Sequence, residues 1–152
     1  MGRAQNDGRY DVLRLENQLC FPLYACAKEI VRQYRKPLEP LKLTYTQYLV
    51  MMALWEYGEV TEGELGGRLL LDSGTLAPLL KRLEKQGYIR RVRPAGNERR
   101  LNLSLTEAGL ALREEALRVP EAMRGCIGLA PEELMQLKQL LDKAMKMMEE
   151  NA

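Results

Sequence analysis

Three cysteines in a chain without histidine are the residues whose chemistry needs explaining. Cys20 and Cys26 lie six positions apart in the stretch NQLCFPLYACAKEI, residues 17–30, and Cys126 follows much later. A thiolate, unlike a thiol, attacks a peroxide oxygen and becomes a sulfenic acid. A cysteine on the apolar face of a helix is more often a small buried side chain, which is our interpretation of Cys26. Cys20 has different neighbours, which leave a reactive role open beside the structural one.

Phenols are the neighbours that distinguish Cys20. Tyr24 follows it by four positions and lies on the same face of a helix, where its hydroxyl can approach the sulfur. Tyr34 lies 14 positions on, about 40° round the helix but about 21 Å along it. It therefore cannot touch Cys20 of its own chain. In an antiparallel dimer of such helices it could meet Cys20 of the partner, and Tyr45 could arrive from the start of the next helix. Phenol donors stabilise a thiolate.

The sulfenic acid needs a second thiol to resolve it. Six helical residues place the Cα atoms of Cys20 and Cys26 about 10 Å apart, beyond the limit of about 7 Å for a disulfide. Cys26 is thus a poor partner unless Pro22 breaks the helix. Cys126 lies between glycines in a break between late helices, a place that can move.

Several functional classes are excluded by what the sequence lacks. Without histidine there are no His-based acid–base pairs or triads, and three cysteines without a CxxC pair make no zinc site. Neither a GxxxxGK[ST] loop nor a GxGxxG turn after a strand is present. We therefore expect no metal, no cofactor and no enzyme. No signal peptide or long apolar run occurs, so we expect a cytoplasmic protein without a membrane partner, its thiols normally reduced.

The first half of the chain reads as helices. From Leu15 apolar residues recur at spacings of three and four, which predicts a long helix over residues 13–36 that Pro22 kinks and two later prolines end. Thr44 and Thr61 each begin a capping box ahead of a helix. Asp72 or Ser73 caps the next helix, and a glycine at position 87 ends it.

The second half predicts a hairpin and more helices. YIRRVR and RRLNLSL are β-favouring runs joined by PAGNE, a flexible tip. Thr106 then caps a helix that Pro120 interrupts, and Pro131 begins a last helix with an apolar seam. The expected fold is mainly α with a small β-hairpin wing: a winged helix-turn-helix over residues 44–104, dimerising through helices within 13–36 and 106–150. The 152 residues make one subunit.

Charge is concentrated on the part that would face DNA. Residues 81–100 hold eight Lys or Arg against two Glu, a local charge of +6, while the whole chain carries only +2. A basic segment on a mildly acidic body is typical of a nucleic-acid-binding face. Short hydroxyl donors at a helix start and cations further on suit phosphates and base edges, and a basic hairpin tip suits the minor groove. The candidate DNA-binding residues are Ser73, Thr75, Pro78, Lys81, Arg82, Arg93, Arg99 and Arg100.

Four stretches occur along the chain in this order: LENQLCFPLYA, LTYTQYLVMMALWE, LLLDSGTLAPLLKRLEKQGYI and NERRLNLSLTEAG. From Leu15 to the C-terminus the chain resembles the multiple antibiotic resistance regulator (MarR) family of winged helix-turn-helix repressors. Within that family the four stretches resemble the organic hydroperoxide resistance regulators (OhrR). One departure is Asn97, where the family usually carries an Asp that pairs with an arginine of the wing tip.

The resemblance implies a mechanism. A homodimer binds an inverted-repeat operator in double-stranded DNA when reduced and releases it when Cys20 is oxidised by an organic hydroperoxide. Tyr34 and Tyr45 of one subunit hydrogen-bond the reactive Cys20 of the other. The two-cysteine members join the reactive cysteine of one subunit to a late cysteine of its partner, which implies an intersubunit disulfide from Cys20 to Cys126. A mixed disulfide of Cys20 with a small thiol is the alternative if the two chains do not crosslink.

Two other functions remain open from the sequence. A thiol peroxidase would use the same Cys20 and Cys126, but it would need no basic winged element. A repressor of the same fold could instead respond to a small phenolic ligand in the cleft between its dimerising and DNA-binding parts, with Cys20 merely buried.

Overall fold

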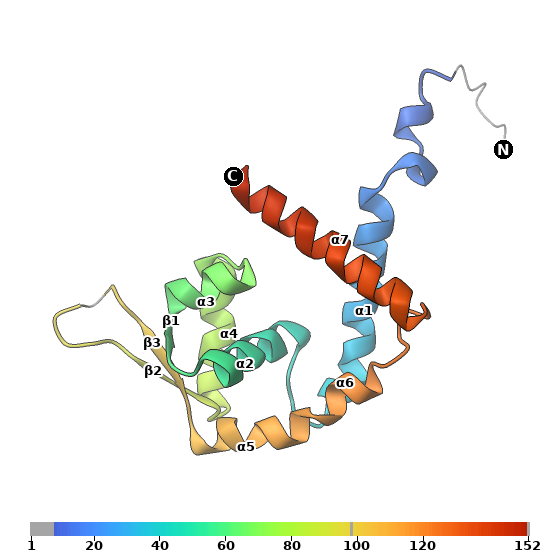
Figure 1. Cartoon of the computed structure of the whole chain (residues 1–152). Helices are drawn as coiled ribbons and strands as arrows, with labels where there is room; N and C mark the ends of the chain where they lie inside the picture. The colour runs from blue at the N-terminus through green and yellow to red at the C-terminus, as the bar shows by residue number, and fades with distance from the viewer. Residues whose placement is uncertain (1–7, 98, 152) are drawn as a thin grey trace, which may run out of the picture.

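Helices dominate the computed structural model, which describes residues 8–97 and 99–151. Figure 1 shows a helical body from which one hairpin projects on one side and α1 on the other, with α7 starting beside α1 and running back toward the body. The elements follow in the order η1 (Asp11–Leu13), η2 (Leu15–Asn17), α1 (Cys20–Leu38), α2 (Tyr45–Tyr57), β1 (Val60–Thr61), α3 (Glu62–Leu69), α4 (Ser73–Lys85), β2 (Ile89–Val92), β3 (Asn102–Leu105), α5 (Glu107–Ala116), α6 (Arg118–Ala122) and α7 (Pro131–Glu150). The expected class, mainly α with a β wing, is confirmed.

The first long helix begins later than the apolar spacing indicated. Residues 11–17 form two short 3₁₀ turns, and α1 starts only at Cys20. The side chains of Asn17 and Gln18 donate to the backbone carbonyls of Asp11 and Val12, so they hold the chain in turns instead of helix. Pro22 consequently lies in the first turn of α1, where its missing N–H would be unpaired in any case. The expected kink beside Cys20 is therefore wrong.

The helix starts within residues 44–85 follow the expected caps. Thr44 and Thr61 form complete capping boxes with Gln47 and Glu64 at the starts of α2 and α3. At α4 the cap is Asp72, whose carboxylate accepts from the backbone N–H of Thr75 at 2.9 Å. Side-chain chemistry thus fixes where each of these helices begins.

The wing belongs to a three-stranded antiparallel sheet in the order β1-β3-β2. The expected hairpin is β2 and β3, with Arg91 opposite Leu103. No sequence pattern predicted β1, a strand of two residues in which Val60 pairs with Leu103. This pairing ties the base of the wing to the start of α3.

Pro120 and Pro37 lie inside helices that they were expected to end, whereas Pro131 begins a helix as expected. The helix capped by Thr106 ends at Ala116, and Pro120 lies inside the short helix α6 instead of ending α5. Pro131 occupies the first position of α7 as expected. Likewise Pro37 lies inside α1, which ends one residue later.

A close approach between α5 and the start of the wing holds the body together. The carbonyl oxygen of Gly109 accepts from the indole N–H of Trp55 in α2 at 2.8 Å. A Cβ atom at Gly109 would lie 1.9 Å from the carbonyl oxygen of Tyr88, so only glycine fits here. Around this contact lies a core built mainly from leucines of α2, α3, α4 and the sheet.

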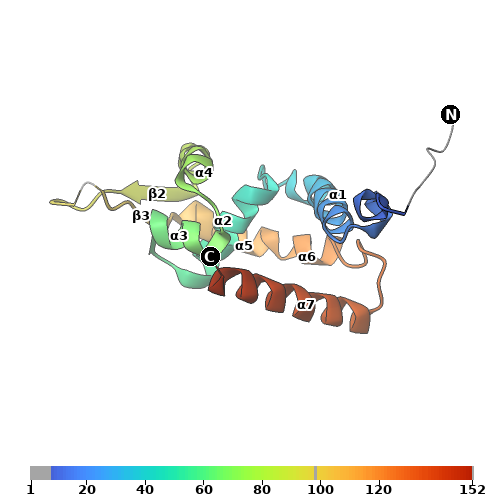
Figure 2. The same cartoon turned by 90° about the horizontal axis from the view of Figure 1, so that it is seen from above.

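The helices expected to dimerise bury almost nothing within one chain. Only Leu38 of the 19 residues of α1 is buried, and none of the 20 residues of α7 is, all of which the structure describes. Exposed apolar residues of these helices include Phe21, Leu23, Leu140, Leu141 and Met148. Figure 2 shows α7 on the side of the molecule opposite α4. Within the described residues, no helix has the length and apolar content that crossing a bilayer would require.

Candidate functional site

Cys20 is the first residue of α1, and its side chain is exposed. The first backbone N–H groups of a helix have no partner inside it, and the macrodipole places partial positive charge there. A helix start therefore suits negatively charged groups in general. The sequence reasoning missed this, because the apolar stripe placed Cys20 in the middle of a longer helix. The signal was the pair Asn17 and Gln18, polar residues able to bond the preceding turn.

Tyr34 and Tyr45 form a pair at the other end of α1. Their ring centroids lie 4.6 Å apart, and the ring of Tyr48 lies 6.0 Å from that of Tyr34. Burial raises the pKa of Tyr34, and the neighbouring Tyr45, Tyr48 and Cys126 raise it further. Burial likewise raises the pKa of Tyr45. Both phenols therefore keep their protons near neutral pH and can act as hydrogen-bond donors.

Within one chain the structure does not bring the tyrosine pair to Cys20. Fourteen residues of α1 separate Cys20 from Tyr34, a rise of about 21 Å. Tyr24 is one helical turn from Cys20 and 64% exposed, and the ammonium of Lys28 lies 5.9 Å from its ring centroid. Among the three predicted phenols, only Tyr24 is within reach of the sulfur in the same chain.

Cys126 lies in the turn after α6, half buried against the core. It is close enough to Tyr34 to affect the phenol electrostatically. A cavity of about 290 Å³ is lined by both Cys126 and Cys26. The single chain therefore places Cys126 beside Cys26 and leaves Cys20 at the far end of the helix. All three thiols are free, and Cys26 is exposed in the single chain, so the expectation of a buried Cys26 is wrong.

The candidate recognition helix α4 presents its predicted contacts to solvent. Ser73, Thr75, Pro78, Lys81 and Arg82 are all exposed. The hydroxyl of Thr75 donates to the carboxylate of Asp72 at 2.9 Å, which leaves its oxygen as an acceptor only. Asp72, which the sequence offered only as one of two caps, thus orients one of the predicted DNA contacts.

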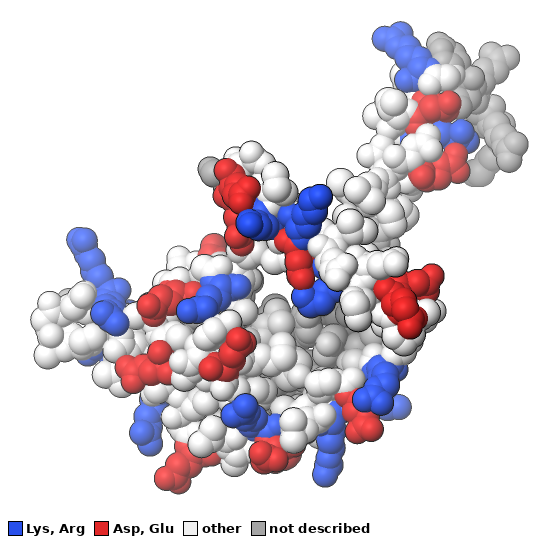
Figure 3. All heavy atoms as spheres, in the orientation of Figure 1, with Lys and Arg blue, Asp and Glu red and all other residues white. Residues whose placement is uncertain are grey.

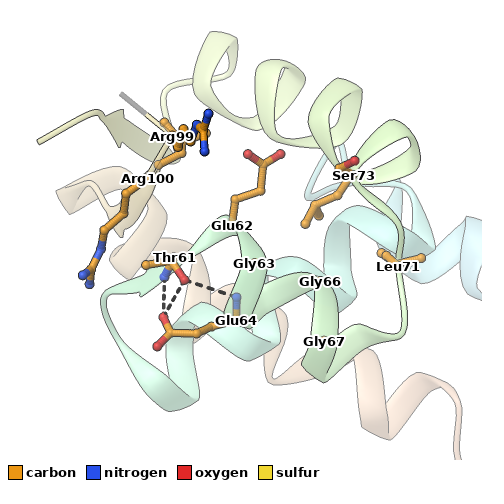
Figure 4. A pocket seen from close by; sticks show the side chains of 12 residues that line it. Thr61, Glu62, Gly63, Glu64, Gly66, Gly67, Leu71, Ser73, Arg99 and Arg100 are labelled. Atoms are coloured by element: carbon orange, nitrogen blue, oxygen red, sulfur yellow. Dashed lines mark hydrogen bonds between the residues drawn. The ribbon is translucent and has the colours of Figure 1, made fainter. Parts of the chain in front are cut away.

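The wing adds three exposed arginines. Arg93 follows β2, and Figure 3 shows Lys and Arg side chains gathered at the projecting wing, at the left of the view. A cavity of about 540 Å³ lies between α3, α4 and the wing, and the side chains of Ser73 and Arg99 face this space (Figure 4). Arg100 points the other way, and its Nε donates to the side-chain oxygen of Asn102 at 3.1 Å. Arg99 and the start of α4 therefore line the same surface, whereas Arg100 is hydrogen-bonded within the wing.

A link between the tyrosine pair and α4 was not expected from the sequence. Lys42, in the turn between α1 and α2, has a positive φ of 54°. Its carbonyl oxygen accepts from the side chain of Gln86, the C-cap residue of α4, at 2.8 Å. The hydroxyl of Tyr88 lies 3.5 Å from the carbonyl oxygen of Leu41. The end of the candidate recognition helix is thus bonded to the turn that precedes Tyr45.

Comparison with known proteins identifies the family. Residues 43–101 match the model of the MarR family. The organic hydroperoxide resistance transcriptional regulator of Bacillus subtilis is 45% identical over 89% of this chain and 92% of its own length. The reduced, DNA-bound structure of AbfR, a protein of Staphylococcus epidermidis, is 35% identical and matches with a TM-score of 0.74, covering 93% of this chain and 98% of that one. A disulfide-containing AbfR structure, 36% identical, matches with a TM-score of 0.62, covering 93% and 99%.

The raised pKa values of the tyrosines predict how stability depends on pH. Above pH about 10 the unfolded chain loses its phenol protons before the folded one, so the stabilisation present at lower pH is lost as the pH rises through the raised values. We expect Tyr34→Phe to lose less stability than the parent between about pH 8 and about pH 11. Urea unfolding followed by the fluorescence of Trp55, the single tryptophan, measures this. An equal loss in both proteins would contradict it.

Proposed function

The chain belongs to the MarR family, and we propose that it is a homodimeric DNA-binding repressor that releases its operator when an organic hydroperoxide oxidises Cys20. The observation that carries this proposal is the arrangement along α1. An exposed cysteine begins the helix, and a pair of protonated phenols lies near its other end. The relative named for organic hydroperoxide resistance supports the same chemistry. We place the repressor in the cytoplasm, where its thiols stay reduced until oxidant arrives.

The dimer is supported by what one chain leaves uncovered. Two helices of 19 and 20 residues with a single buried residue between them would expose a large apolar area in a monomer. Packing α1 and α7 against those of a second copy covers this area. If the two α1 helices run antiparallel, the start of each lies beside the end of the other. Tyr34 and Tyr45 of one subunit then reach Cys20 of its partner.

The sensing reaction transfers two electrons. The Cys20 thiolate, favoured by the phenol donors, attacks the terminal oxygen of the hydroperoxide. The O–O bond breaks, an alkoxide leaves and takes a proton to become the alcohol, and Cys20 becomes a sulfenic acid. The Cys126 thiol of the partner subunit then attacks this sulfur. A disulfide forms, and the hydroxyl leaves as water.

Oxidation reaches the DNA-binding surface through the turn between α1 and α2. A sulfenic acid or a disulfide at Cys20 no longer presents a thiolate to Tyr34 and Tyr45, so the end of α1 and the start of α2 lose their contact with the partner. Gln86 bonds this turn to the end of α4. A shift there changes the spacing of the two recognition helices, which must match about one turn of DNA.

The DNA contacts follow the exposed cations. We propose that the start of α4, with Ser73 and Thr75, enters the major groove and that Lys81 and Arg82 bind phosphates or a guanine edge. Pro78 is exposed on the same helix. Arg93 and Arg99 would place the wing in the adjacent minor groove, where cations are favoured. Arg100 would act through the wing's conformation, because its side chain faces away from α4.

One observation favours a second function. A cavity of about 510 Å³ lies between α1 and the start of α2, lined by Arg35, Lys42 and Tyr45 among others. A small phenolic or carboxylate ligand bound there would act on the same turn without any reaction at Cys20. The peroxide-sensing function is preferred because it accounts both for the cysteine at the start of α1 and for the tyrosine pair near its end.

Salt dependence tests the DNA contacts. Each phosphate contact contributes a slope of about 0.9 to the fall of log K with log salt, so Arg82→Gln in both subunits should lower the slope by about two. Arg113→Gln removes the same charge from an exposed position on α5 and should leave the slope unchanged. Fluorescence anisotropy measures both, using a duplex that the reduced protein selects from a random library. If Arg82→Gln and the parent have equal slopes, Arg82 does not contact a phosphate of the DNA.

Peroxide-dependent release tests the sensor. Cumene hydroperoxide should release the selected duplex from the parent and from Cys26→Ser but not from Cys20→Ser, which has no thiolate to oxidise. The measurement is an electrophoretic shift with and without oxidant. Release from Cys20→Ser by peroxide would contradict the proposal. Release from Cys20→Ser by a phenolic ligand, with no response of the parent to peroxide, would establish the second function instead.

A further inference from the structure

Two cysteines of the same chain share a cavity that the sensing reaction does not use. Cys26 and Ile30 of α1 line one side of this space of about 290 Å³, and Cys126 and Ile127 of the turn after α6 line the other. Contacts between α1 and α6 hold the two walls together. In the described residues, Cys126 therefore has Cys26 as its neighbouring thiol.

The helix geometry separates Cys26 from Cys20. Six residues at about 100° each place the two side chains about 120° apart around α1. Cys26 is on the side of α1 that meets its own α6 turn, together with Ile30 one turn further on. Cys20 points elsewhere, which suits a thiol that works with a second subunit. Cys26 thus faces Cys126 of its own chain, and Cys20 is placed to react with a second subunit.

The backbone around Cys126 can bring the sulfur to Cys26. Gly125 and Gly128 have positive φ values of 78° and 73°, and their Cβ positions are free of contacts. The turn is held by short-range bonds, Cys126 N–H to Met123 O at 3.1 Å and Gly128 N–H to Gly125 O at 3.0 Å. Both glycines lie between α6 and α7, outside the two helices, and glycine tolerates a wider range of backbone angles than other residues.

We propose that Cys26 and Cys126 form a reversible disulfide within one chain, by exchange with the intersubunit disulfide between Cys20 and Cys126. This rests on the proposed function. The Cys26 thiol loses its proton to solvent, and its thiolate attacks the Cys126 sulfur. The bond between Cys126 and the partner's Cys20 breaks, and Cys20 leaves as a thiolate. No further oxidant is consumed, because one disulfide replaces another.

The exchange gives the repressor a second oxidised state. Cys20 returns to its reduced form while the two oxidising equivalents remain stored between Cys26 and Cys126. The covalent link between the subunits is lost, so the dimer can bind its operator again or react with a second hydroperoxide. Cys26 is exposed and Cys126 is half buried, so a small thiol would reach this disulfide at the Cys26 sulfur.

A time course after one equivalent of cumene hydroperoxide per subunit tests the exchange. On a denaturing non-reducing gel, the parent should form a covalent dimer that decays to monomer. In Cys26→Ser the dimer should persist at least about tenfold longer, because no thiol remains to attack it. Ala25→Ser, a neighbouring change in the same cavity, should behave like the parent. Peptide mapping by mass spectrometry should find Cys26 linked to Cys126 in the decayed parent.

A second arm makes the result independent of peroxide sensing. In Cys20→Ser, the thiol oxidant diamide should remove both remaining thiols and leave a monomer on the gel. If these thiols persist, or if they crosslink two chains, the inference is wrong even where the parent releases DNA with peroxide. If the internal disulfide forms here but peroxide does not act on the parent, the sensing proposal fails and the thiol pair stands. An equal dimer lifetime in the parent and Cys26→Ser would also overturn the exchange.

Discussion

The length of α1 between Cys20 and Tyr34 determines which chain can supply phenol donors to the thiolate. Cys20 begins α1, and the phenols that can donate to its thiolate lie about 21 Å away near the other end. No rotamer closes that gap within a chain, so the proposed contact can form only where two α1 helices pass each other. The same helix leaves its apolar face uncovered. In the proposed dimer the sensor therefore lies in the subunit interface, and a change at the sulfur alters how the subunits pack.

The path from this interface to the DNA is short. Tyr45 is the first residue of α2, and the turn before it contains Lys42 in a left-handed conformation. Gln86 at the end of α4 holds the carbonyl of that turn. On the other side of α4, an ion pair of 3.3 Å between Arg91 and Glu84 ties the helix to the wing. The turn, α4 and the wing thus form one connected unit, so a small movement at the tyrosine pair can reposition the whole DNA-binding surface.

Local chemistry could be predicted from the sequence, and long-range chemistry could not. The capping boxes at Thr44 and Thr61 were predicted correctly because a hydroxyl and its partner three residues later act within one turn. The start of α1 was not, because apolar spacing continued past the point where Asn17 bonds the preceding turn, and so the position of Cys20 at a helix N-terminus was missed. The bond from Gln86 joins residues 44 positions apart. The strand β1 is too short to show any periodicity and exists only through its pairing with β3.

Mixed dimers test most directly whether the phenols act across the interface. One dimer combines a Cys20→Ser chain with a Tyr34→Phe, Tyr45→Phe chain, so the remaining Cys20 can receive phenols only from its partner. The other combines a chain with all three changes and a parent chain, whose Cys20 has phenols only in its own chain. The rate of Cys20 oxidation by cumene hydroperoxide should be parental in the first dimer and slower by about tenfold or more in the second, the effect of losing charge-assisted hydrogen bonds. Slow oxidation in the first dimer and parental oxidation in the second would contradict the account.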